Sequence, residues 1–316
     1  MTAGPVSGQG RVVDHWPARA VDGDTPTLIL VGSMHGNEPS GTEALRRVFA
    51  NLRREDARVH GELIGLVGNV RALAVGARFL ERDLNRMWTT EQVASARAAS
   101  AAAPADTAQS ELAELAELAD LLDEVLARAR GPVYVLDLHT TSADGIPFGI
   151  VGPSEAHRGF ASEFLLPGIV GIEEKLEGVL TGYLSRRGCV TLAVEGGRNA
   201  SAAAAANLEA VVTIALAAAG VVDADDLSDL EWARDHLAWA RGDLPQLIEV
   251  TSRHEVRPEH GFKMEPGYAN IQRTSSGDLL AHDATGEIRA PFDGLVLLPL
   301  YQPQGADGFF YGRPLD

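Results

Sequence analysis

The sequence predicts an α/β fold, with a sheet flanked by helices, followed by a small β-rich module at the C-terminus. Four short apolar runs bounded by turn residues are typical of buried strands. These runs lie at residues 25–32, 61–70, 132–139 and 189–197. Helical patterns alternate with them at residues 39–52, 110–130 and 199–220. Because strands and helices alternate along the chain, the sequence indicates an α/β core.

Periodicity and end signals predict the three helices. Pro39 is tolerated in the first turn of the helix at 39–52, because the missing N–H of a proline would have no partner there. The helix at 110–130 presents one apolar stripe to the core, as an amphipathic helix does. That stripe consists of Leu112, Leu115, Ala119, Leu122 and Leu126. The alanine-rich helix at 199–220 can end at Gly220, since glycine favours the backbone conformation of a helix end.

The composition changes near residue 223. The segment "DADDLSDLEWARDHLAW" is acidic and is predicted to form a connecting helix. From Leu247 onward, short apolar runs alternate with turn residues, which predicts strands and turns. We therefore expect a core domain over residues 1–222, followed over residues 223–316 by the connecting helix and a C-terminal β-module.

The charge of the chain excludes several classes of partner. Its 316 residues carry a net charge of −17, and the pI is about 4.9. A protein this acidic repels phosphate backbones and anionic lipid, so we expect neither a nucleic acid nor a membrane partner. No apolar stretch approaches the roughly 20 residues that cross a bilayer. The sequence leaves the oligomeric state open, a homo-oligomer included.

Cysteine usage and the N-terminus suggest a compartment. The single cysteine, Cys189, allows no disulfide within the chain and suits a reducing environment. The first residues, "MTAGPVSGQGRVV", lack the charged start and apolar core of a signal peptide. We therefore expect a cytoplasmic protein.

Polar side chains follow three of the predicted strands. His35 and Glu38 come after the first strand, His139 ends the third, and Glu195 ends the fourth. Open α/β sheets bind ligands at the carboxyl ends of their strands, so these side chains can meet at one edge. Two histidines and a glutamate are a known ligand set for catalytic zinc. A separate carboxylate, such as Glu195, would then take the proton of the metal-bound water.

Each of these motifs is weak by itself. A His-x-x-Glu pair also suits a capped turn, and a histidine after a strand also suits a hydrogen bond to the backbone. Their joint appearance at strand ends, flanked by glycine or threonine, favours a metal site.

The segment "NVRALAVGARFLERDLNRMW" is a second candidate for function. It holds four arginines, Arg71, Arg78, Arg82 and Arg86, together with Asp83 and Asn85. A solvated, charged loop is the simplest interpretation, but apolar residues alternate with these charges. Arginine side chains bind carboxylates through two parallel hydrogen bonds, so this loop could hold an anionic substrate.

The motifs "GSMHGNE", "RFLERDLNR", "DLH" and "VEGG" occur in this order along the chain. Together they resemble the succinylglutamate desuccinylase and aspartoacylase family, a branch of the zinc-carboxypeptidase-like fold, over about residues 25 to 220. The C-terminal β-module resembles the second domain of that family. The resemblance implies a mixed sheet flanked by helices. It also implies that the protein is a zinc-dependent amidohydrolase, which removes the acyl group of a small N-acyl amino acid.

The same resemblance implies roles for single residues. His35, Glu38 and His139 match the ligands of one zinc ion per chain. Glu195 matches the general base and acid, and Arg78 the arginine that polarises the scissile carbonyl. Asn85 and Arg86 match a pair that binds a substrate carboxylate. Asp83 is more consistent with a residue that holds this loop in place.

The sequence departs from the family pattern in two places. A further substrate arginine shortly before the general base has two candidates, Arg186 and Arg187. A tyrosine from the second domain also has two candidates, Tyr311 and Tyr301. These positions leave the acyl group and the amino acid of the substrate open.

Two other functions compete with deacylation. A zinc carboxypeptidase that acts on short peptides shares the metal ligands but needs a roomier cleft. A non-catalytic zinc protein would use its β-module as a binding surface. The presence of Glu195 argues against the second alternative, because a structural zinc site normally closes its fourth position with a protein ligand.

Overall fold

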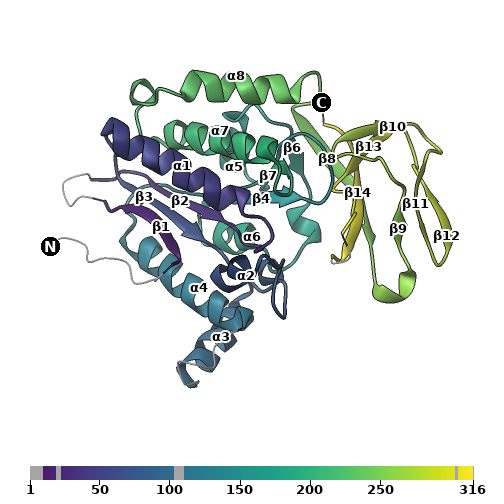
Figure 1. The fold of residues 1–316 in the computed structure, drawn as a ribbon, viewed down its shortest axis with the longest axis horizontal. Coiled ribbons are helices and arrows are strands. Elements are labelled where there is room, and N and C mark those ends of the chain that lie inside the picture. Colours follow the sequence, from purple (N-terminus) through teal and green to yellow (C-terminus); the bar gives the residue numbers. More distant parts are fainter. Residues whose placement is uncertain (1–9, 19–22, 103–109, 303–304, 316) are drawn as a thin grey trace.

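The structure, a computed structural model, describes residues 10–18, 23–102, 110–302 and 305–315 (Figure 1). Its strands form an 11-stranded mixed sheet and a separate three-stranded sheet. Across the large sheet the strands are β1 (Val12–Trp16), β3 (Glu62–Val67), β2 (Thr27–Gly32), β4 (Val133–Thr141), β7 (Val190–Arg198), β5 (Phe148–Val151), β6 (Gly168–Val170), β8 (Leu247–Glu255), β14 (Asp307–Pro314), β13 (Gly294–Leu297) and β10 (Gln272–Thr274). The small sheet consists of β12 (Gly286–Arg289), β11 (Leu279–Asp283) and β9 (Lys263–Met264).

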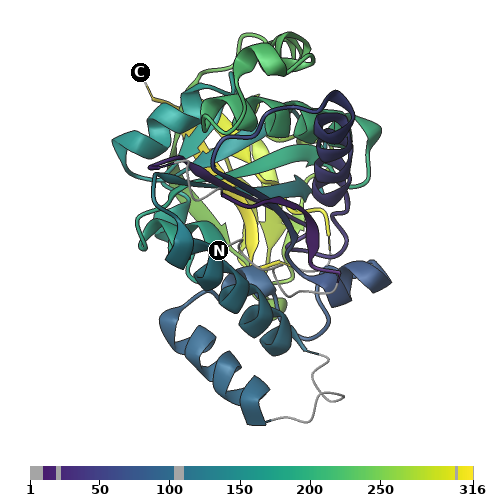
Figure 2. The ribbon, with the colours of Figure 1, turned by 90° about the vertical axis from the view of Figure 1, so that its left-hand side faces the viewer.

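Helices cover both faces of the large sheet. One face carries α1 (Ser40–Glu55), α5 (Glu155–Ser162), α7 (Ala202–Ala218) and α8 (Leu230–Arg241). The other face carries α2 (Val70–Val75), α3 (Thr90–Ala102), α4 (Glu111–Arg128) and α6 (Leu180–Ser185), as Figures 1 and 2 show. The predicted α/β fold with a β-rich C-terminal region is confirmed. Among the described residues, no helix combines the length and apolar character that a bilayer crossing requires.

The central strands contribute side chains to both helical layers. In β2, Leu28 and Leu30 belong to the hydrophobic cluster under α1 and α7. Ile29 and Val31 belong to the cluster on the α4 side. Because successive side chains of a strand point to opposite faces, a strand covered on both sides must be apolar throughout. This requirement explains the continuous apolar runs in the sequence.

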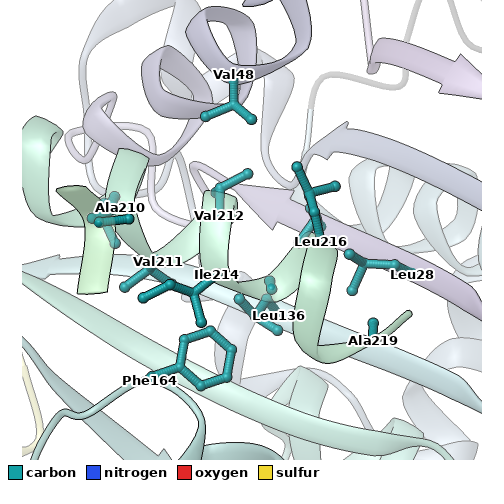
Figure 3. Close-up of a cluster of buried hydrophobic side chains, with 14 of the residues drawn as sticks. Leu28, Val48, Leu136, Phe164, Ala210, Val211, Val212, Ile214, Leu216 and Ala219 are labelled. Carbon is teal, nitrogen blue, oxygen red and sulfur yellow. The ribbon is translucent and has the colours of Figure 1, made fainter. Parts of the chain in front are cut away.

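The helix α7 lies at the centre of the helical layer that also contains α1, α5 and α8. It packs against α1, α8 and β7, and most of its residues are buried. Figure 3 shows Val211, Ile214 and Leu216 of this helix around Leu136 of β4 and Phe164. Alanine elsewhere in the helix lets its neighbours approach closely, which explains its unusual composition.

The C-terminal strands extend the large sheet at its far edge. The strand β8 pairs in parallel with β6 and antiparallel with β14. A third hydrophobic cluster lies across this junction, with Phe148 and Ile169 on one side and Leu295 and Phe310 on the other. The C-terminal region therefore has a fixed position beside the core. The predicted division at residues 222 and 223 stays a prediction.

Leu136→Ala should lower the free energy of unfolding by about 2–5 kcal/mol, because a fully buried leucine leaves a cavity when it is truncated. Chemical denaturation would measure the change. Leu315→Ala is the matched control, since its side chain is 42% exposed, and it should change stability by less than about 0.5 kcal/mol. Equal losses in the two variants would contradict the proposed core.

Candidate active site

Adjacent parallel strands bring the predicted polar residues together. The strands β2, β4 and β7 are neighbours, and His139 lies directly opposite Glu195 in the register of β4 and β7. The turn after β2, which carries His35 and Glu38, packs closely against α2. A Cβ atom at Gly36 would lie 2.1 Å from the backbone carbon of Ala72, so only glycine fits in this turn. The carboxyl ends of the strands therefore form the site.

His35, Glu38 and His139 form a buried cluster with the spacing of a metal site. One ligand atom of each residue lies within 4.8 Å of the others. The Nδ1 atom of His35 is 3.0 Å from Oε1 of Glu38, and Nδ1 of His139 is 3.2 Å from Oε2. The two Nδ1 atoms thus converge on one carboxylate. These contacts suit a divalent cation held by both imidazoles and the carboxylate.

The electrostatics of the cluster follow from its burial. Burial raises the pKa of the Glu38 carboxyl, but His35 and His139 outweigh this effect and lower it. Burial opposes the charged form of His139, yet Asp137 and Glu38 raise its pKa well above the ordinary value. In the same way, burial opposes and Glu38 favours the charged form of His35, whose pKa is raised. A concentration of negative charge thus surrounds the two imidazoles.

The outer nitrogens of both histidines face carboxylates. Nε2 of His35 is 3.1 Å from Oδ1 of Asp83, and Nε2 of His139 is 2.9 Å from Oδ2 of Asp137. A carboxylate at the outer nitrogen keeps a proton there and leaves the inner nitrogen free for a metal. Asp83 was predicted to hold its loop. Asp137 was not singled out, although its place two residues before His139 puts both side chains on one face of β4.

Glu195 lies beside this cluster without a hydrogen bond at one oxygen. Its Oε2 atom is buried and has no hydrogen-bond partner among the described residues. Burial, with a smaller contribution from Glu38, raises the pKa of Glu195 to about 7, against the opposing effect of His139. A carboxyl group with a pKa near neutrality can accept and donate a proton under physiological conditions.

The segment with four arginines at residues 69–88, the arginine loop, contacts the cluster through Arg78. The Nη1 atom of Arg78 donates to Oε1 of Glu38 over 3.4 Å, and its Nη2 atom donates to Oδ2 of Asp83 over 3.2 Å. Asn85 places its Nδ2 atom 3.3 Å from Nε2 of His139 and accepts a hydrogen bond from the N–H of Leu180. Arg78 and Asn85 therefore lie next to the proposed metal ligands.

A residue of α4 holds the arginine loop in place. The buried carboxylate of Glu111 accepts hydrogen bonds from the backbone N–H groups of Leu80, Glu81 and Arg82. Although burial favours the neutral acid, these donors lower the pKa of Glu111. Sequence reasoning missed Glu111, because its contacts are to backbone atoms about 30 residues earlier in the chain.

Both parts of the chain line one cavity of about 340 Å³. The metal-ligand cluster, Glu195, Arg78, Asn85 and Arg86 line it, together with residues from the C-terminal region such as Leu298, Leu300, Asp307 and Phe310. The structure thus brings the three predicted metal ligands and the predicted catalytic and carboxylate-binding residues to the same space.

The uncertain substrate residues lie elsewhere. Arg186 and Arg187 are exposed and do not line the cavity, and Arg187 pairs with Asp123 at 2.6 Å. The hydroxyl of Tyr311 contacts Thr274, and that of Tyr301 donates to a backbone carbonyl of the C-terminal region. Neither tyrosine is among the lining residues.

The fold and the His–Glu–His cluster at its strand ends define an α/β protein with a candidate metal centre. The family model described as the succinylglutamate desuccinylase/aspartoacylase catalytic domain matches residues 24–238. The chain belongs to this family.

Individual curated relatives match only a part of this chain. A succinylglutamate desuccinylase of Pseudomonas syringae pv. tomato is 33% identical over 82 residues, which are 26% of this chain and 24% of that protein. The match thus spans about a quarter of that curated relative.

Solved structures share the fold over most of the chain. Succinylglutamate desuccinylase from Vibrio cholerae aligns with a TM-score of 0.65 and 16% identity, over 95% of this chain and 84% of that chain. The product-bound ectoine utilization protein EutE (DoeB) from Ruegeria pomeroyi aligns with a TM-score of 0.66 and 19% identity, over 98% of this chain and 97% of that chain. At these identities the likeness concerns the fold.

Glu111→Gln should loosen the arginine loop, because an amide replaces a charge that accepts three backbone N–H groups. We expect faster hydrogen exchange at Leu80, Glu81 and Arg82, and a loss of stability of about 1.5–3 kcal/mol. Glu124→Gln is the matched control, since Glu124 is exposed on the same helix. Unchanged exchange at these three amides would show that Glu111 does not order the loop.

Proposed function

We propose that the protein is a zinc-dependent amidohydrolase that removes the acyl group from a small N-acyl amino acid and releases a carboxylate and a free amine. The observation that carries this proposal is the convergence of His35, Glu38 and His139 with Glu195 at the edge of one cavity. Membership of the family and the names of its relatives support the same reaction.

His35, Glu38 and His139 would hold the zinc ion. When bound, zinc supplies Lewis acidity, which makes a water molecule more acidic and polarises the amide carbonyl. Asp83 and Asp137 orient the two imidazoles through their outer nitrogens. The chemistry of this donor set fits zinc, since two nitrogens and a carboxylate are ligands that zinc prefers.

Glu195 is the proposed proton-transfer group. Its unpaired Oε2 would take a proton from the attacking water and then deliver it to the leaving amine. Arg78 would share the negative charge that develops on the carbonyl oxygen. Asn85 and Arg86 would bind a carboxylate of the substrate and so orient the amide bond.

The size of the cavity favours a small substrate over a peptide. A volume of about 340 Å³ is close to the lower end of small-molecule sites, which begin near about 300 Å³. A zinc carboxypeptidase acting on short peptides remains the alternative, but it needs room for the rest of the peptide. We further propose a cytoplasmic location, in keeping with the single cysteine.

His139→Ala should abolish stoichiometric zinc binding, because the two remaining ligands cannot maintain the site. Elemental analysis after zinc loading and gel filtration would measure the metal content. His282→Ala serves as the control, since His282 is a partly exposed histidine of the C-terminal region. One zinc per chain in His139→Ala would contradict the assignment.

Glu195→Gln should retain zinc and lose about 10²–10⁴-fold in kcat, because an amide of the same shape cannot accept the proton. Zinc content and kcat should be measured on the same preparation. Glu163→Gln, an exposed glutamate outside the cavity, should behave as the unchanged protein. A Glu195→Gln variant with normal zinc and a normal rate would remove Glu195 from the mechanism. Loss of zinc would make it a ligand or a structural residue.

A further inference from the structure

From the side chains that line the cavity we infer the charge class of the substrate. The geometry points to an N-acyl amino acid whose α-carboxylate is its only charge and whose acyl group or side chain is apolar. This inference rests on the proposed function and narrows it.

The cavity offers one arginine to a substrate carboxylate. Among the described lining residues, the guanidinium groups belong to Arg78 and Arg86, and no lysine lines the space. Arg78 is only 13% exposed, and Glu38 and Asp83 already bind it. Arg86 is 34% exposed and donates one hydrogen bond to the backbone oxygen of Asn85. Among the described lining residues, Arg86 is therefore the one cation placed to receive a carboxylate.

Even this cation is partly neutralised. Oδ2 of Asp307 lies 3.4 Å from Nη2 of Arg86, and Oδ1 of the same carboxylate accepts a hydrogen bond of 2.5 Å from Arg253. Asp307 thus connects the two arginines and fixes the direction of Arg86. Arg253 does not line the cavity, so it adds no second binding group there.

The rest of the lining is acidic where it is charged. Among the described residues, the carboxylates of Glu38, Asp83, Asp137, Glu195 and Asp307 line the cavity. Because Arg86 is the one guanidinium among the described lining residues that is open to a substrate, a second or third substrate carboxylate would be desolvated beside these carboxylates without a cation of its own.

The remaining wall is apolar. Ile150, Ile172, Leu176, Leu298 and Phe310 line the cavity, and all five belong to the third hydrophobic cluster or pack against it. Part of this cluster's surface therefore forms a wall of the site. Contact with this wall makes the binding of an alkyl or aryl group more favourable, whereas it makes the binding of a charged group less favourable.

A set of five substrates separates these properties. N-Acetyl-leucine has one carboxylate, N-acetyl-glutamate and N-succinyl-leucine have two, and N-succinyl-glutamate has three. N-Acetyl-ornithine adds an ammonium group instead. We expect kcat/KM of the zinc-loaded protein to be highest for N-acetyl-leucine and to fall about tenfold or more with each added carboxylate. A higher value for N-succinyl-glutamate or N-acetyl-ornithine would overturn the inference.

Binding provides an independent measurement. Calorimetry with the Glu195→Gln variant should show the same order of dissociation constants, without turnover. If the unchanged protein hydrolyses none of the five, the proposed function is wrong, but the order of binding still decides the inference. Tightest binding of a compound with two or three carboxylates, or of N-acetyl-ornithine, would overturn it.

A variant of the apolar wall tests the cause. Leu176→Arg places a cation beside the acidic lining at a partly buried position. It should raise kcat/KM for N-succinyl-leucine relative to N-acetyl-leucine by about tenfold, whereas Leu176→Gln, a polar control without charge, should not. If both variants retain the stability of the unchanged protein and neither shifts this ratio, the wall does not determine charge selectivity.

Discussion

The buried carboxylate of Glu38 is the interaction on which the arrangement of the site depends. Its two oxygens contact His35 and His139, accept the backbone N–H of Thr140 at 3.0 Å, and pair with Arg78. A carboxylate this deeply buried is costly unless several donors surround it. The end of β4, the turn after β2 and the arginine loop must therefore meet at one point. No one of these three segments supplies all the donors that the buried carboxylate of Glu38 needs.

A second set of buried charges supports the loop from behind. Arg11 contacts the backbone oxygens of Val67 and Gly68 and pairs with Glu114 of α4. Glu114 also accepts a hydrogen bond from the backbone N–H of Arg71, while Glu111 on the same helix holds residues 80–82. Successive acidic residues of α4 thus fix both ends of the segment that delivers Arg78. The amphipathic pattern of this helix concealed that role, since acidic residues also suit a solvated face.

The sequence predicted what depends on local pattern and on general rules of α/β folds. Continuous apolar runs identified β2, β3, β4 and β7, because strands covered on both faces have no polar side. The rule that ligands bind at the carboxyl ends of such strands predicts that His35, His139 and Glu195 lie at one edge of the sheet. The fold and the family are confirmed, while the roles of the single residues stay predictions.

Long-range partners were less accessible to sequence reasoning. Asp307 reaches Arg86 from 221 positions away, and no pattern in the sequence relates the two. The uncertain tyrosines show the same limit, since Tyr311 is an apolar-strand residue whose hydroxyl points into the C-terminal module. Which side chain of the β-module reaches the cavity depends on how β8 and β14 pair, and local composition does not encode that register.

A protein with a net charge of −17 that binds an anion must concentrate its positive charge locally. Counterions screen exposed charges beyond about 8 Å at physiological ionic strength, so most of the surface charge has little influence inside the cavity. The charged groups within that distance therefore determine how the cavity interacts with a charged substrate. The carboxylates among them already contact the proposed metal ligands and the arginines. Asp83 and Asp137 face the histidines, and Asp307 faces Arg86. The acidity of the site therefore follows from the need to hold its cations in place, and this need limits how much negative charge a substrate can carry.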